Sequence, residues 1–184
     1  MIKSVTLFFV LFFVVSAGGK SVQAQEPRDT AIQASDYALA WSGILPDHPL
    51  YALTILRDRI VFHLVVKPEK KLEYYLLQTD KGIYATKLLV DKGKIALATE
   101  TALKAEHNYT QLVSDYKWMF FYSVEIPDKL LRKIKTAALK HQEVLELIAQ
   151  QVPEKDATSF LQVKEFSRRN LEELESLRKG QDTQ

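Results

Sequence analysis

Apolar side chains recur every three or four positions over long stretches of this sequence, the spacing that gathers them on one face of an α-helix. Five stretches show the pattern. The last four are each roughly 25 residues long, enough for helices of about 37 Å. The apolar positions are Leu53, Leu56, Ile60 and Leu64; Leu72, Tyr75, Leu76, Thr79, Ile83, Thr86 and Val90; Ile95, Ala98, Ala102, Ala105, Tyr109, Val113 and Tyr116; Ile134, Ala137, Ala138, His141, Leu145 and Ile148; and Phe160, Val163, Leu171 and Leu174.

A proline followed by an acidic residue precedes most of these stretches. Proline is tolerated in the first turn of a helix, where its missing N–H would have no partner. An acidic side chain in that turn interacts favourably with the helix dipole. We therefore predict that these pairs mark helix starts, and that a second proline, Pro49, opens the first helix with Asp47 or His48 as its cap. The pairs are Pro46-Asp47, Pro68-Glu69, Pro127-Asp128 and Pro153-Glu154.

Short connectors between long helices are typical of antiparallel bundles, because consecutive helices then become neighbours. The predicted fold class is all-α: an antiparallel bundle of four long helices, with one shorter N-terminal helix at 49–66 that packs on the bundle or caps it. The bundle domain spans 46–178 and ends in a polar tail at 179–184.

Two segments before the long helices lack a clear pattern. Residues 25–45 show no sustained period, and we interpret them as an extended segment anchored by Tyr37 and Trp41. Residues 60–66, IVFHLVV, are apolar on every side, which fits a strand as well as a buried helix. We interpret them as helix, either wrapped by the other helices or facing a partner.

The first 24 residues are typical of a secretory signal peptide. Lys3 precedes the apolar residues 5–17, and Val22-Gln23-Ala24 offers a cleavage site after Ala24. The apolar run is shorter than the roughly 20 residues of a membrane-spanning helix. An uncleaved anchor is the alternative. We therefore expect a secreted or extracytoplasmic protein located in the cell envelope.

Charge and cysteine content exclude several partners. Of the 25 basic residues, Lys3 and Lys20 lie in the leader, which has no acidic residue, so the mature chain carries 23 basic and 23 acidic groups. A chain with no basic excess is a poor ligand for nucleic acid. The absence of cysteine excludes a disulfide-linked partner and thiolate metal sites.

No catalytic or cofactor-binding motif is present, so we predict a non-enzymatic protein without a cofactor or a bound metal. His141 lies within an apolar stripe and is the candidate polar site of the core. A histidine satisfied by Tyr75, Thr79 or a backbone carbonyl is favoured over a metal or enzyme site centred on it. Asp80-Lys81 lies on a polar face, where we predict surface salt bridges to the first helix rather than an anion site.

An aromatic run ends the third periodic stretch. Neighbouring side chains on a helix point about 100° apart, so these residues cannot all face one core. They either plug the end of the bundle or form an exposed patch that docks on a membrane surface, a glycan or an envelope protein. We expect Phe120 to be buried and Trp118 to be exposed. The candidate contact residues are Trp118, Phe120, Phe121 and Tyr122.

The stretches GILPDHPLYALTILRDRI, PEKKLEYYLLQTDKGI and VDKGKIALATETALKAEHNYT resemble a bacterial domain family of unknown function. The resemblance covers about residues 36–178 and rests on an opening Pro-Asp-x-Pro-Leu-Tyr motif followed by helices. It implies a helical, secreted or envelope-attached domain and supplies no catalytic residue. The aromatic run departs from the charged or polar connector that this family usually has there.

These observations lead to one functional hypothesis and two alternatives. The hypothesis is a non-enzymatic extracytoplasmic helical module that binds or scaffolds a partner in the cell envelope. One alternative is a periplasmic-type chaperone or sensor that holds apolar peptides. The other is a metal or enzyme site centred on His141.

Overall fold

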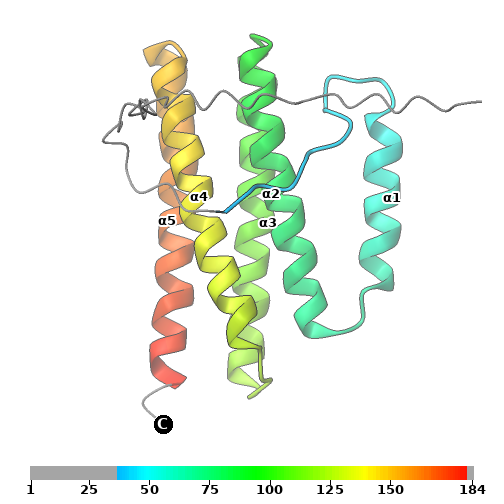
Figure 1. The fold of residues 1–184 in the computed structure, drawn as a ribbon, viewed down its shortest axis with the longest axis vertical. Helices are drawn as coiled ribbons and strands as arrows, with labels where there is room; N and C mark the ends of the chain where they lie inside the picture. The colour runs from blue at the N-terminus through cyan, green and yellow to red at the C-terminus, as the bar shows by residue number, and fades with distance from the viewer. Residues whose placement is uncertain (1–36, 182–184) are drawn as a thin grey trace, which may run out of the picture. The chain divides into compact units, whose positions relative to one another are not determined.

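The computed structural model describes residues 37–181, so the predicted signal peptide and most of the predicted extended segment lie outside the described residues. Five helices and no strand form this part of the chain (Figure 1), as the all-α prediction requires. Residues 60–64 are helical, whereas Val65 already has an extended backbone. The helices are α1 Tyr51–Leu64, α2 Pro68–Asp91, α3 Ile95–Phe121, α4 Asp128–Gln151 and α5 Glu154–Gln181.

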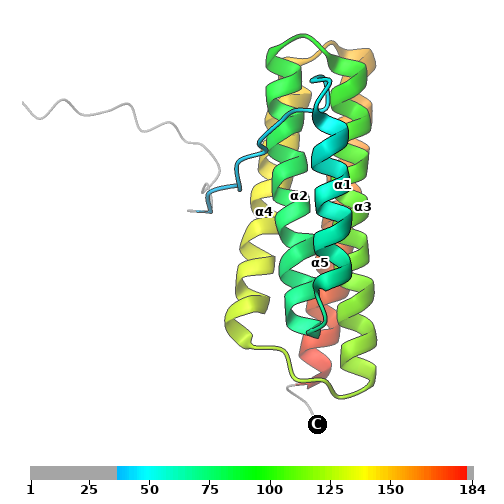
Figure 2. The same ribbon diagram turned by 90° about the vertical axis from the view of Figure 1, so that its right-hand side faces the viewer.

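The four long helices form a bundle in which successive helices run in opposite directions (Figure 1). α2 packs against α3 and α4, and α5 packs against the same two helices. α3 and α4 therefore lie diagonally across the bundle, although a short connector joins them. The prediction that consecutive helices become neighbours is wrong at this connection, because residues 122–127 cross the end of the bundle rather than one of its sides (Figure 2).

The core lies between these four helices, as their apolar periodicity predicts. It consists of two clusters, one towards each end of the bundle. Every member of both clusters lies in a compact unit, Gln33–Gln184, which therefore carries a complete core of its own. The fully buried large side chains include Leu72, Leu76, Ile83, Leu89, Tyr109, Leu112, Tyr116, Ile134, Leu145, Ile148, Phe160 and Leu174.

Three of the proline–acid pairs stand at helix starts. Pro68 is the first residue of α2, and α4 and α5 begin at the residue after Pro127 and Pro153. Each of these helices has an acidic residue in its first turn, where the helix dipole favours it.

The first proline pair behaves differently. α1 begins at Tyr51, so Pro46 and Pro49 lie in the turn before it, and Asp47 does not cap the helix. Asp47 instead pairs with Lys92 at 3.1 Å and Lys94 at 2.9 Å, in the loop between α2 and α3. Hydrogen bonds from Lys94 and Lys92 lower the pKa of Asp47 to about 2. The prediction that Pro49 opens the first helix is wrong because the chain first makes a turn tied to that loop.

Two helices end with a residue in the left-handed backbone region. Gly93 follows α2 with φ +72°, and Ser123 follows α3 with φ +55°. In both turns a backbone N–H donates to a carbonyl five residues earlier, Lys94 to Leu89 and Val124 to Met119. These bonds satisfy carbonyl groups that the helix leaves without partners.

Gly82 sets how closely α2 approaches α3. A Cβ atom added at Gly82 would lie 2.6 Å from the Cβ of Ala105 and 3.2 Å from its Cα. Real carbon atoms do not approach so closely without a shift of the backbone. The absence of a side chain at Gly82 therefore lets the two helices pack at this point.

Gly82→Ala should destabilise the bundle, although alanine is the better helix former. Overpacking of a well-packed interface costs about 1–3 kcal/mol, which exceeds the gain in helix propensity. The free energy of unfolding from urea denaturation measures the effect. The paired variant Gly82→Ala, Ala105→Gly, which moves the methyl group across the interface, should recover part of the loss. A single variant as stable as wild type would contradict this close approach.

Candidate functional site

The first helix presents its apolar stripe to the outside. Leu53, Leu56, Ile60 and Leu64, here called the outer face of α1, have exposed fractions of 61, 55, 54 and 74%. No residue of α1 is buried, and α1 belongs to none of the closely packed helix pairs. Figure 2 views the molecule from the side on which α1 lies, in front of α2 and α3. α1 therefore lies on the bundle with its apolar stripe facing outward.

The inner side of α1 makes contacts that are largely aromatic and polar. The Tyr74 hydroxyl donates a hydrogen bond of 2.9 Å to the backbone carbonyl of Asp58. The ring of Phe62 lies 5.4 Å from that of Tyr74 and 5.6 Å from that of Tyr75. A groove of about 500 Å³ separates α1 from α2 and α3, and polar residues such as Gln78 line much of it. The bundle thus holds α1 by a few contacts on one side and leaves its apolar side uncovered.

The segment before α1 is anchored by one aromatic residue rather than two. The Tyr37 hydroxyl donates a hydrogen bond of 2.6 Å to Asp80 Oδ2, and the Tyr37 ring packs against the core. Trp41 is 73% exposed, so the prediction that it anchors the segment is wrong. Burial and the hydrogen bond to Asp80 raise the pKa of Tyr37.

His141 lies in the core and has a carboxylate partner. Its Nε2 atom is 2.7 Å from Asp80 Oδ1, and the two side chains are 0 and 5% exposed. The Nδ1 atom of His141 and the hydroxyl of Tyr109, whose ring packs edge-on against the imidazole, have no hydrogen-bond partner. Asp80 is thus a core residue and not part of a polar face, and it satisfies His141 in place of the predicted Tyr75, Thr79 or carbonyl.

A second carboxylate is buried on α3. Glu106 is only 3% exposed, and its Oε1 accepts a hydrogen bond of 2.6 Å from Asn170 of α5. Its Oε2 and the neighbouring hydroxyl of Ser167 each lack a hydrogen bond of good geometry. Burial raises the pKa of Glu106 to about 8, and Asn170 and Ser167 only partly oppose this shift. Sequence periodicity did not single out Glu106, which borders the apolar stripe of α3.

These polar groups are buried in the core. Asp80, His141 and Glu106 line none of the four cavities described for this molecule. Within residues 37–181, no three histidine, aspartate or glutamate side chains are placed to hold a metal ion together.

The aromatic residues at the end of α3 are mostly exposed. Trp118, Phe121 and Tyr122 have exposed fractions of 56, 78 and 58%, whereas Phe120 is half-buried. The Trp118 and Tyr122 rings lie 4.5 Å apart, and Phe121 packs on Tyr122 at 5.2 Å. Met119 is buried, so it closes this end of the core while its neighbours face outward.

Two cavities lie near the end of α1, and one of them reaches this aromatic group. One of about 430 Å³ is lined by Val66 and Pro68 on one side and by Trp118 and Met119 on the other. The other, of about 590 Å³, lies where α1 turns into α2 and has Leu64 and Val66 in its wall. Apolar surface therefore continues from the outer face of α1 through Val66, itself 83% exposed, to Trp118.

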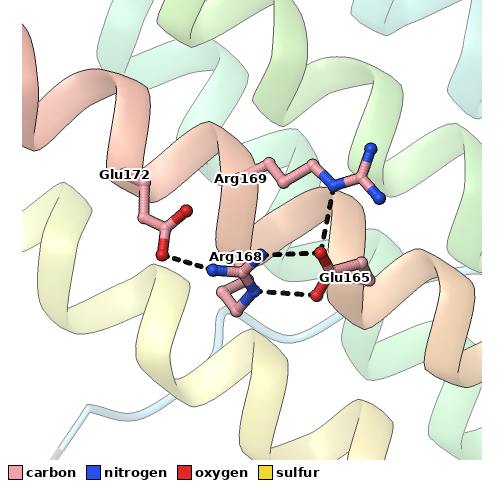
Figure 3. Close-up of polar contacts among 4 residues, drawn as sticks. All are labelled: Glu165, Arg168, Arg169 and Glu172. Atoms are coloured by element: carbon pink, nitrogen blue, oxygen red, sulfur yellow. Dashed lines mark hydrogen bonds and ion pairs between the residues drawn. The ribbon is translucent and has the colours of Figure 1, made fainter.

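The charged residues at the middle of α5 form a closed network (Figure 3). Arg168 pairs with Glu165 through two bonds of 2.7 Å and also with Glu172, while Arg169 pairs with Glu165 at 3.0 Å. Hydrogen bonds from Arg168 and Arg169 lower the pKa of Glu165 to about 2. Two cations and two carboxylates therefore balance each other on this part of α5.

A comparison with protein families places residues 43–155 in a domain of unknown function, DUF5667. The match covers more than half of the chain. This chain belongs to the DUF5667 family. The DUF5667 region includes α1 to α4 and ends at the second residue of α5. The outer face of α1, Asp80 and His141 thus all lie within the DUF5667 region.

Two further comparisons add no relative to this DUF5667 chain. Neither the curated proteins nor the solved structures contain a match. Among the described residues, no helix is long and apolar enough to cross a membrane.

Proposed function

We propose that this DUF5667 protein is a non-enzymatic, extracytoplasmic helical module that binds a partner in the cell envelope through the outer face of α1. The exposure of Leu53, Leu56, Ile60 and Leu64 carries the proposal. Burying a leucine or isoleucine side chain contributes about 1.5–3 kcal/mol. Four such side chains aligned on a helix that the bundle barely covers are typical of a surface that another molecule covers.

The aromatic end of α3 extends this binding surface. Trp118 and Tyr122 combine a large apolar ring with one polar group, a combination that is enriched where one molecule docks on another. Trp118 lines the same cavity as Val66 at the end of α1. Asp80, His141 and Glu106 line none of the four cavities given above, which favours a binding role at the surface.

Location follows from the amino-terminal sequence. The apolar run at 5–17 and the site after Ala24 support export and cleavage. A separate line of support for a bacterial envelope family is the pattern Pro46-Asp47-His48-Pro49-Leu50-Tyr51, together with the helices that follow it. Edman sequencing of the exported protein should begin at Gln25. An exported protein that begins at Met1 and stays in the membrane fraction would contradict cleavage.

The binding surface is tested by polar substitutions on α1. Leu56→Ser, Ile60→Ser should abolish binding of the purified protein to an envelope fraction, because two apolar side chains at the centre of the outer face are lost. The melting temperature should change little, since both positions are already more than half exposed. Sedimentation with the envelope fraction measures binding, and circular dichroism measures melting.

A matched control is available on α4. Leu139 and Leu147 are 44 and 46% exposed but lie on another helix. Leu139→Ser, Leu147→Ser should bind the envelope fraction as wild type does.

Trp118→Ala should weaken binding without a large loss of stability. Normal envelope binding by the α1 variant would refute this assignment of the surface.

A further inference from the structure

We propose that the outer face of α1 lies on an anionic lipid surface, with lipid phosphates bound in the basic groove at the carboxyl end of the helix. This inference rests on the proposed function and names the chemical class of its partner. It follows from the charges that border the apolar surface, from their arrangement along α1, and from the aromatic residues beside it.

The basic groove is the cavity of about 590 Å³ at the turn between α1 and α2. Its walls combine apolar and basic side chains, as a site for a lipid phosphate and the first part of an acyl chain requires. The only acidic residue in the wall, Glu73, accepts a hydrogen bond of 2.6 Å from Lys70. Within the described chain, no ion pair involves Lys67 or Lys133. The lining residues are Leu64, Val65, Val66, Lys67, Lys70, Glu73, Tyr74, Leu77 and Lys133.

Cations also border the outer face of α1 along its length. Arg57 and Arg59 flank the apolar stripe on its two sides, as their spacing along the helix requires. The only acidic residue of α1, Asp58, is mostly covered, with 19% of its side chain exposed, and it pairs with Arg57. An exposed apolar stripe flanked by arginines suits the surface of an anionic membrane, because the apolar side chains can be buried there while the guanidinium groups meet the lipid phosphates.

The same charges disfavour a second copy of the chain as the partner. A symmetric contact through the outer face would place the same patch of both molecules together. Arg57 and Arg59 of one molecule would then lie near Arg57 and Arg59 of the other, and like charges in contact are unfavourable. An anionic partner removes this repulsion.

The aromatic end of α3 suits a lipid surface as well. Tryptophan and tyrosine side chains are enriched at the level of lipid headgroups, where one end of the ring is apolar and the other is hydrated. Trp118 borders the cavity that also contains Val66, next to the basic groove. Lys71 lines that cavity as well, together with Asp115. Apolar, basic and aromatic side chains thus meet at one end of α1.

The chain from Gln25 to Gln184 is suitable for the test, because the unit that starts at Gln33 contains a complete core. We would measure sedimentation with vesicles of phosphatidylcholine and with vesicles of equal parts phosphatidylcholine and phosphatidylglycerol. Binding to the mixed vesicles should be at least about 10-fold stronger, since each cation near an anionic surface strengthens binding about five-fold. Raising the salt concentration from about 0.05 M to about 0.5 M should remove most of this difference by screening.

Two pairs of variants separate the apolar and basic contributions. Leu56→Ser, Ile60→Ser should weaken binding to the mixed vesicles by about 10-fold per residue. Lys67→Gln, Lys133→Gln should weaken it by about five-fold per residue, with no change towards phosphatidylcholine alone. The controls are two double variants that make the same changes away from the basic groove. One combines Leu139→Ser with Leu147→Ser, and the other combines Lys87→Gln with Lys155→Gln. Both controls should bind as wild type does.

Three results would overturn the lipid assignment. The first is wild-type protein that binds the envelope fraction through α1 but binds neither vesicle. Loss of that binding after protease treatment of the envelope fraction would then identify a protein partner and leave the proposed function intact. The second is a dimer in analytical ultracentrifugation that Leu56→Ser, Ile60→Ser dissociates, which would identify a second copy. The third is binding unchanged by all α1 substitutions, which would refute the proposed function as well.

Discussion

Replacing Glu106 by glutamine should make the protein more stable at pH 7. The variant should also lose much less stability than wild type does when the pH rises from 5 to 8. The cause is the burial of this carboxyl group, which raises its pKa from 4.5 to about 8. At neutral pH the folded protein therefore keeps a proton on Glu106 that the unfolded chain releases.

The sign of the effect follows from this difference in bound protons. Between pH 4.5 and pH 8 the folded state binds more protons than the unfolded state, so raising the pH favours unfolding. Stability linked to Glu106 is fully present below about pH 4.5 and is lost as the pH rises through about 8. A neutral glutamine has no such dependence. We expect Glu106→Gln to gain about 1–3 kcal/mol at pH 7, with little difference from wild type at pH 4.5.

The local hydrogen bonds suit this substitution. The Asn170 amide that donates to Glu106 Oε1 can donate to the glutamine oxygen at the same place. The buried Ser167 hydroxyl lies beside Glu106 and helps to lower its pKa, and as a hydroxyl it can also accept a bond from the glutamine amide.

Urea denaturation at pH 5, 7 and 9 measures these effects. Glu100→Gln is the control, because Glu100 lies on the same helix with 59% of its side chain exposed. It should change stability by less than about 0.5 kcal/mol at each pH. The pKa interpretation would be wrong if Glu106→Gln and wild type lost the same stability over this range.

Replacing His141 by leucine should destabilise the bundle by about 3–5 kcal/mol, because Asp80 then remains buried without its imidazole partner. The double variant Asp80→Leu, His141→Leu should recover much of the loss. It leaves no buried carboxylate at this site, and the Tyr37 hydroxyl that bonded Asp80 is only partly buried. The two sites should therefore be strongly coupled, with the double variant far more stable than the sum of the single effects predicts.

The exposed pair Lys87–Asp91 on α2 provides the comparison. It also joins a basic to an acidic side chain, at 2.8 Å, but both side chains are nearly half exposed. Its coupling in an equivalent double-mutant cycle should be about 0.3–0.5 kcal/mol. Similar couplings at the buried and exposed pairs would show that Asp80 and His141 do not form the contact described here.

The position of Asp80 could not be derived from the sequence. Lys81 follows it, and a charged pair on a helix usually faces solvent, so the pattern favoured a surface location. The structure brings Asp80 of α2 against His141 of α4, 61 positions along the chain. This contact depends on α2 and α4 being neighbours in the bundle. The presence of a buried polar group at His141 was predictable, because it lies inside an apolar stripe.

α1 shows a second limit of sequence patterns. Its outer face follows helical spacing, but its inner side also carries large apolar or aromatic residues, such as Phe62 and Tyr51. Two opposed apolar sides identify a helix without showing which side is covered. The exposure of Trp118 and Phe121 could not be derived from the sequence for a similar reason. Which members of an aromatic run are buried depends on the elements that pack against them.

The sequence by itself determined five helices, three helix starts at prolines and the buried stripes of the four long helices. These features depend on interactions between residues a few positions apart, which periodicity and turn chemistry report directly. Only the tertiary structure decided that α3 and α4 lie diagonally, that Asp80 meets His141, and that the apolar stripe of α1 faces outward. Which surfaces meet depends on how whole helices pack, and this packing is determined by contacts between residues far apart in the chain.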